Sequence, residues 1–132
     1  MKMSKAGFTL VELMVVAIIV AILAAVAIPL MMGNKNRAMA TEAQAGLGTL
    51  RTAMQVYKAE HEAYPTLSAQ TMNNVTVLTV KNGDLDGKYF RTTGYTVSST
   101  ISNYTLSATG YTNGAENLTI TLNQNGDWGG VP

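Results

Sequence analysis

The most constraining feature of this sequence is a long apolar run near its N-terminus that contains one carboxylate. Between Phe8 and Asn34 the only charged residue is Glu12, and Leu13–Met32 supplies 20 consecutive uncharged residues. A helix of that length spans about 30 Å at about 1.5 Å per residue, which matches the hydrocarbon thickness of a membrane. A carboxylate within such a segment costs about 2.5–3.5 kcal/mol on insertion scales. Glu12 therefore needs a specific reason to be there.

Composition narrows the possible functions. The chain of 132 residues has a net charge of +1, and charged residues make up 13% of it, about half the usual share in soluble domains. A net charge this small gives no electrostatic reason to expect nucleic-acid binding. The chain has no cysteine and one histidine, so we expect neither a thiolate metal site nor a histidine-based catalytic cluster. We therefore expect a protein that is not an enzyme and that binds neither a cofactor nor a metal ion.

Two ordinary interpretations of the apolar run each leave something unexplained. A secretory signal peptide fits Ala25-Val26-Ala27, which matches a signal-peptidase site and would release a soluble binding domain. Such apolar regions usually cover about 7–15 residues, whereas this run continues past Ala27 to Met32. A single-span membrane anchor explains the length of the run but gives Glu12 no role.

A third interpretation accounts for both features. Residues 1–7, Met-Lys-Met-Ser-Lys-Ala-Gly, form a short basic leader, and Phe8-Thr-Leu-Val-Glu12-Leu follows directly. With Pro29 further along the run, this pattern resembles the prepilin signature of type IV pilins and type II secretion pseudopilins. The resemblance extends in pattern to about residue 65.

The resemblance implies a series of processing and assembly steps. A membrane prepilin peptidase would cut after Gly7 on the cytoplasmic side and N-methylate the new first residue, Phe8. The mature chain would cross the inner membrane once, until inner-membrane assembly machinery builds it into a helical homo-oligomeric filament. Glu12 would guide subunit assembly, and Pro29 would kink the helix or locally unwind it.

Electrostatics gives Glu12 a function once cleavage after Gly7 is assumed. Cleavage creates a positive amine on Phe8, at a helix N-terminus that already carries about +0.5 of partial charge. Glu12 lies just over one turn away and can face this amine or, by the resemblance, the amine of the preceding subunit. Pairing offsets the desolvation of both ions, and a subunit out of register leaves one unpaired. The alternative is an interfacial carboxylate without a partner.

Residues 35–63 are expected to continue the helix as an amphipathic segment. Gly46 and Gly48 each cost about 1 kcal/mol relative to alanine, so this segment needs packing against a domain. Tyr64-Pro65 predicts its end, because a residue before proline avoids helical angles. One apolar stripe recurs every three or four residues: Met39, Ala43, Leu47, Leu50, Met54, Tyr57 and His61. We expect the lone histidine to be only a helix-end side chain.

The C-terminal half, residues 64–132, is rich in Thr, Ser, Asn and Gly and predicts about four antiparallel strands. Packed against the helix, they give an α+β, type IV pilin-like fold. The strand candidates are Val75–Val80, Lys88–Arg91, Tyr95–Thr100, Tyr104–Thr109 and Leu118–Leu122. Turn residues separate them at Asn82-Gly83, Gly94, Asn103, Gly110, Asn113-Gly114 and Asn125-Gly126.

Two loops are candidates for a calcium site. Asn82–Gly87 resembles the start of a calcium loop, but Thr93 stands where the bidentate Glu belongs, so a plain turn is preferred. Major type II pseudopilins resemble this chain in Tyr64-Pro65-Thr66. Their Asp-rich loop near the C-terminus is not evident here, because Asn123–Trp128 offers only Asp127. This departure favours a pilin over a pseudopilin.

The leading hypothesis is therefore a pilin that polymerises into an extracellular type IV pilus for adhesion, twitching motility or DNA uptake. The first alternative is a pseudopilin of a type II secretion system, forming a short periplasmic pseudopilus. The second alternative is a secreted soluble binding domain, cleaved after Ala27.

Overall fold

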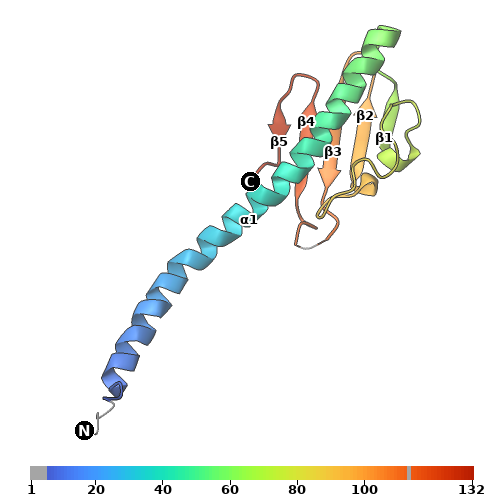
Figure 1. Cartoon of the computed structure of the whole chain (residues 1–132). Coiled ribbons are helices and arrows are strands. Elements are labelled where there is room, and N and C mark those ends of the chain that lie inside the picture. Colours follow the sequence, from blue (N-terminus) through green and yellow to red (C-terminus); the bar gives the residue numbers. More distant parts are fainter. Residues whose placement is uncertain (1–5, 113) are drawn as a thin grey trace. The chain divides into compact units, whose positions relative to one another are not determined.

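The computed structural model describes residues 6–112 and 114–132. The leader cations Lys2 and Lys5, and Asn113 of one predicted turn, lie outside these residues. One long helix, α1 (Leu10–His61), precedes a five-stranded sheet (Figure 1). Contacts divide the chain into two compact units between Asn34 and Lys35, and each unit is described by itself. The strands are β1 (Leu67–Thr71), β2 (Tyr95–Ser99), β3 (Tyr104–Thr109), β4 (Thr119–Asn123) and β5 (Trp128–Gly129), with short 3-10 turns η1 (Met72–Asn74) and η2 (Thr92–Gly94).

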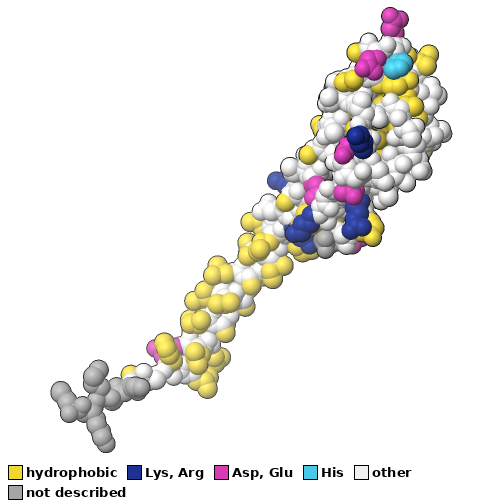
Figure 2. All heavy atoms as spheres, turned by 45° about the vertical axis from the view of Figure 1, so that its right-hand side comes forward, with side chains coloured by type: hydrophobic (Ala, Val, Ile, Leu, Met, Phe, Trp, Pro, Cys, Tyr) yellow, Lys and Arg dark blue, Asp and Glu magenta, His cyan; other side chains and the backbone are white. Residues whose placement is uncertain are grey.

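The first unit exposes its apolar side chains. Seventeen large apolar residues between Phe8 and Met32 are at least 50% exposed. Figure 2 shows apolar side chains along the visible face of this segment. This part of α1 is long and apolar enough to cross a membrane, by length and composition. Burying one such side chain contributes about 1.5–3 kcal/mol. Their sum exceeds the usual stability of a domain, about 5–15 kcal/mol, so lipid or other subunits must cover this surface.

The second unit has one core between the C-terminal half of α1 and the sheet. The expected stripe is buried from Met39 to Met54, Tyr57 is half-buried, and His61 at the helix end is exposed. Gly46 has a packing reason to be glycine, because an added Cβ would overlap the ring of Tyr95. The helix ends at His61, two residues before the expected end. The sheet contributes Val97, Leu106, Ala108, Ile120 and Leu122 to the core, all 1% exposed or less.

The sheet is an antiparallel meander in the order β1-β2-β3-β4-β5. The pairing of β2 with β3 is regular from Tyr95 opposite Ala108 to Ser99 opposite Tyr104. The pairing of β1 with β2 shifts register between Leu67 and Gln70. The strand predictions for Tyr95–Thr100, Tyr104–Thr109 and Leu118–Leu122 are confirmed, with bounds that differ by at most one residue.

Two strand predictions are wrong. Val75–Val80 and Lys88–Arg91 lie in the long connection between β1 and β2. The first places Val75, Leu78 and Val80 in the core as a loop, while the edge position next to β2 is taken by β1. Strands β1 and β5 were not predicted. β1 contains Ala69 at a positive φ of 45°, beside its register shift, and β5 has only two residues.

Glu42 on α1 holds the second of these loop segments in place. Its Oε1 accepts hydrogen bonds from the backbone N–H groups of Tyr89 at 2.9 Å and Phe90 at 2.8 Å. Its Oε2 accepts one from the N–H of Lys88 at 3.2 Å. The loop also passes so close that a Cβ on Gly87 would overlap this carboxylate. One side chain therefore accepts hydrogen bonds from three consecutive backbone N–H groups of a segment that forms no strand.

The Glu42→Ala substitution should destabilise the second unit. It removes the acceptor of three part-buried or exposed N–H groups, so we expect a loss of about 2 kcal/mol in the free energy of unfolding. Urea unfolding of the full chain in detergent, followed by the fluorescence of the single tryptophan Trp128, measures this. The matched control is Glu60→Ala, an exposed residue of the same helix, with an expected change within about 0.5 kcal/mol. Equal effects of the two substitutions would contradict the role of Glu42.

Candidate functional site at the start of the helix

The predicted cleavage bond lies ahead of the helix and is accessible. Gly7 and Phe8 precede the first helical residue, Leu10, and both are exposed, Phe8 by 84%. A Cβ added to Gly7 would meet no atom within 4 Å. Nothing within the described chain therefore requires glycine at this position. If a peptidase cuts this bond, a requirement for glycine would come from that enzyme's pocket.

Thr9 and Glu12 form a capping box at the start of α1. The Thr9 N–H and its hydroxyl both donate to Glu12 Oε2, at 2.7 and 2.9 Å. In return the Glu12 N–H donates to Thr9 Oγ1 at 3.3 Å. The first helical hydrogen bond runs from the Leu13 N–H to the Thr9 carbonyl oxygen at 3.3 Å. A Ser or Thr with a Glu three residues later satisfies orphan N–H groups of a helix start in this way.

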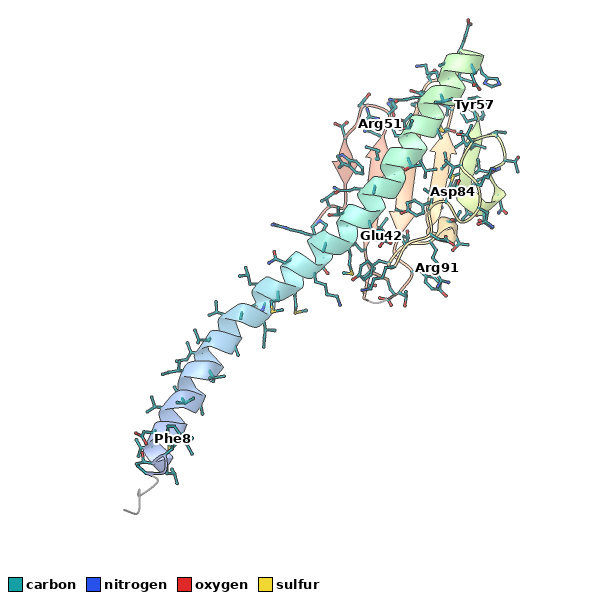
Figure 3. The ribbon with its side chains drawn as sticks, viewed as in Figure 1. Phe8, Glu42, Arg51, Tyr57, Asp84 and Arg91 are labelled. Atoms are coloured by element: carbon teal, nitrogen blue, oxygen red, sulfur yellow. The ribbon has the colours of Figure 1, made fainter. Side chains whose placement is uncertain are left out.

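This geometry shows how the carboxylate could meet an amine. Glu12 Oε2 lies 2.7 Å from the backbone nitrogen of Thr9, and the nitrogen of Phe8 is the next one back along the chain. An amine created on Phe8 would therefore form within short reach of a carboxylate that is already held at the helix start. Around it the side chains of Phe8, Val11 and Leu13 are apolar, and they are 84%, 67% and 59% exposed. Figure 3 labels Phe8 at the start of the helix. Once these side chains are covered, an unpaired charge there becomes costly.

Thr9 is the residue of this site that the sequence analysis missed. The signal was present, since Thr9-Leu-Val-Glu12 fits the spacing of a capping box directly before an apolar run. The site does not bring Pro29 near Glu12. Helical structure continues through Pro29 without a break, so the local unwinding is not seen, while a kink there and the role of Glu12 in assembly stay predictions.

The other residues singled out in the sequence serve local structure. His61 stacks on Tyr57 with ring centroids 4.1 Å apart, and its Nδ1 lies 3.1 Å from the Tyr57 carbonyl oxygen. The two carboxylates of Asn82–Gly87 accept backbone hydrogen bonds, Asp84 from Lys81 at 2.9 Å and Asp86 from Thr92 at 2.7 Å. The bonds from the Thr92 N–H and hydroxyl, aided by Arg91, lower the pKa of Asp86. These contacts support the interpretation of this segment as a turn.

Known proteins share the sequence pattern of this site. Residues 2–28 match the prokaryotic N-terminal methylation motif. The chain is 36% identical to type II secretion system core protein G of Vibrio cholerae over 89 residues, which is 67% of this chain and 58% of the relative. It is 40% identical to the protein of the same name from Klebsiella michiganensis over 65 residues, 49% of this chain and 46% of the relative. The match to the Escherichia coli K12 protein is 42% over 60 residues, 46% of this chain and 41% of the relative.

The exposed apolar helix, the capped carboxylate and the helix-on-sheet domain define a subunit with the architecture of a type IV pilin. With the methylation motif and these relatives, the chain belongs to the family of type IV pilins and type II secretion pseudopilins. It spans about half the length of the relatives that it matches.

Two substitutions at Glu12 separate capping from docking. Glu12→Gln keeps an acceptor for the capping box but removes the charge, whereas Glu12→Ala removes both. If the charge docks each subunit, both variants should be cut after Gly7 like the unaltered chain and both should give little sheared filament. Mass spectrometry of the membrane fraction and the yield of sheared filament measure these two steps. Normal assembly of the Glu12→Gln chain would reduce the role of Glu12 to helix capping.

Proposed function

We propose that this chain is a pseudopilin of a type II secretion system, a structural subunit without enzymatic activity. Prepilin peptidase would release residues 1–7 and methylate Phe8, and the mature chain would wait in the inner membrane as a single span. The secretion assembly machinery would then stack copies of it into a short periplasmic pseudopilus. Growth of this filament would push secreted proteins toward the outer membrane.

The observation that carries this proposal is the similarity to core protein G from several bacteria, extending over as many as 89 residues. This favours the pseudopilin over the pilus subunit that the missing Asp-rich loop suggested. The exposed apolar surface of α1 supports filament formation, because an extracted subunit must exchange lipid for the helices of its neighbours.

Deletion of the gene in its own bacterium tests the proposal. We expect proteins destined for the medium to accumulate in the periplasm, while surface filaments and twitching motility remain. Complementation with the unaltered chain or with Glu60→Gln, an exposed control on α1, should restore secretion, and complementation with Glu12→Gln should not.

The alternatives predict different results in the same experiment. Loss of surface filaments with intact secretion would identify a pilin and contradict the pseudopilin. A mature chain that begins at Ile28 and is recovered free in solution would identify the secreted binding domain instead.

A further inference from the structure

The sheet of the second unit is built from strands that carry no charged residue. Their sequences are LSAQT, YTVSS, YTLSAT, TITLN and WG. In an ordinary soluble domain about 25% of the residues are charged. The charged residues of this unit therefore lie on α1 or in the connections between the strands.

One face of this sheet consists of hydroxyl side chains. The pairings of β2 with β3 and of β3 with β4 are regular over five residue pairs each, so alternate residues point to opposite faces. The inward set lies in the core with α1, which crosses that face of the sheet (Figure 1). We name the outward set the outer hydroxyl face. Its residues, none of them buried, are Thr96, Ser98, Thr105, Ser107, Thr109, Thr119 and Thr121.

The hydroxyls of this face are not used within the chain. They make no hydrogen bond to any residue that the structure describes. The hydroxyls of Thr41, Thr49 and Thr52 on α1 differ, since each donates to the carbonyl oxygen four residues earlier, at 3.0, 3.1 and 3.1 Å. Gly129 leaves the Thr121 hydroxyl uncovered, because a Cβ at this glycine would lie 2.5 Å from Thr121 Oγ1. Every residue of the outer hydroxyl face can therefore still donate and accept.

The chemistry of the face disfavours most kinds of partner. Nucleic acids and anionic lipid headgroups are bound through Lys and Arg, and the face has neither. A stable protein interface has an apolar or aromatic core, which a surface of Thr and Ser hydroxyls does not supply. A neutral ligand rich in hydroxyls fits, because its groups both donate and accept, as those of Thr and Ser do.

The arrangement of the hydroxyls favours a polymer over a small molecule. Neighbouring strands lie about 4.8 Å apart and alternate residues of one strand about 6.8 Å apart, so the hydroxyls form a grid and no enclosed pocket. One neutral hydrogen bond strengthens binding only about two- to tenfold after exchange with water. A single copy would therefore bind weakly, whereas many copies in one filament would bind one long strand together.

We propose that the outer hydroxyl face binds the neutral glycan strands of the bacterial cell wall. The choice of this polysaccharide rests on the proposed function, because a filament that grows through the periplasm meets the cell wall there. Each contact would be weak and would exchange rapidly. Successive copies would therefore steady the growing filament within the wall without stopping its growth.

The test is a nuclear magnetic resonance titration of the mature full chain in detergent micelles. The probe is chitohexaose, a soluble and neutral chain of β-1,4-linked N-acetylglucosamine, which has the backbone linkage of cell-wall glycan. We expect backbone amide shifts that saturate in the millimolar range and are confined to β2, β3 and β4. They should persist in ~0.5 M salt, because no charge takes part.

Matched variants decide whether the hydroxyls are responsible. T105V/T121V removes two hydroxyls of the face and keeps the branched side-chain shape, so we expect about tenfold weaker binding. T76V/T79V removes two exposed hydroxyls from the connection between β1 and β2 and should bind like the unaltered chain. Absence of shifts, shifts centred on the exposed rings of Tyr111 and Trp128, or equal losses in both variants would overturn the inference. The same shifts on raising the protein concentration without sugar would overturn it too, by assigning the face to a second copy.

The titration and the secretion experiment fail separately. A chain that binds chitohexaose through this face, but whose deletion leaves secretion intact, would contradict the pseudopilin and support the glycan site. A secretion defect together with a chain that does not bind chitohexaose would overturn the glycan inference alone.

Discussion

The structure depends on an apolar helical surface that its own chain leaves uncovered. The residues from Phe8 to Met32 expose a large apolar area. The free-energy cost of leaving this area in water exceeds the usual free energy of unfolding of a domain. Lipid or the apolar helices of other subunits must cover this surface. The mature subunit would therefore have two compatible environments, membrane and filament. Glu12 is the one charged group within the surface, so it is the group whose energy would depend most on which neighbour arrives.

Two carboxylates of α1 show how one side-chain type serves different purposes. Glu42 accepts three hydrogen bonds from a loop of its own chain, and these bonds attach residues 88–90 to the helix. Glu12 accepts hydrogen bonds only from Thr9, three residues away, in an exposed setting. The first arrangement is complete within the chain. The second satisfies the helix start but leaves the charge itself without a cation among the described contacts.

The sequence predicted those parts of the fold that depend on local periodicity. The apolar run, the stripe from Met39 to Met54 and the strands at Tyr95–Ser99 and Tyr104–Thr109 all follow from regular spacing. The Val75–Val80 segment has the composition of a strand but lies in a loop, because the place beside β2 is occupied by β1. Sequence spacing could not reveal this competition.

The same distinction holds for the functional residues. Thr9 could have been recognised from its spacing to Glu12, since the capping box is local. The role of Glu42 could not be recognised, because its partners are more than 45 residues away. They are backbone N–H groups, which nearly every residue type has, so the sequence carries no signal for them.

The central claim is that Glu12 is tolerated in an apolar surface because cleavage supplies a positive amine beside it. The most direct measurement is the intact mass, with N-terminal fragmentation, of the chain recovered from sheared assemblies. The account predicts that every assembled copy begins at methylated Phe8. Assemblies built from chains that still carry residues 1–7 would contradict it, because the amine that pairs with Glu12 would not exist.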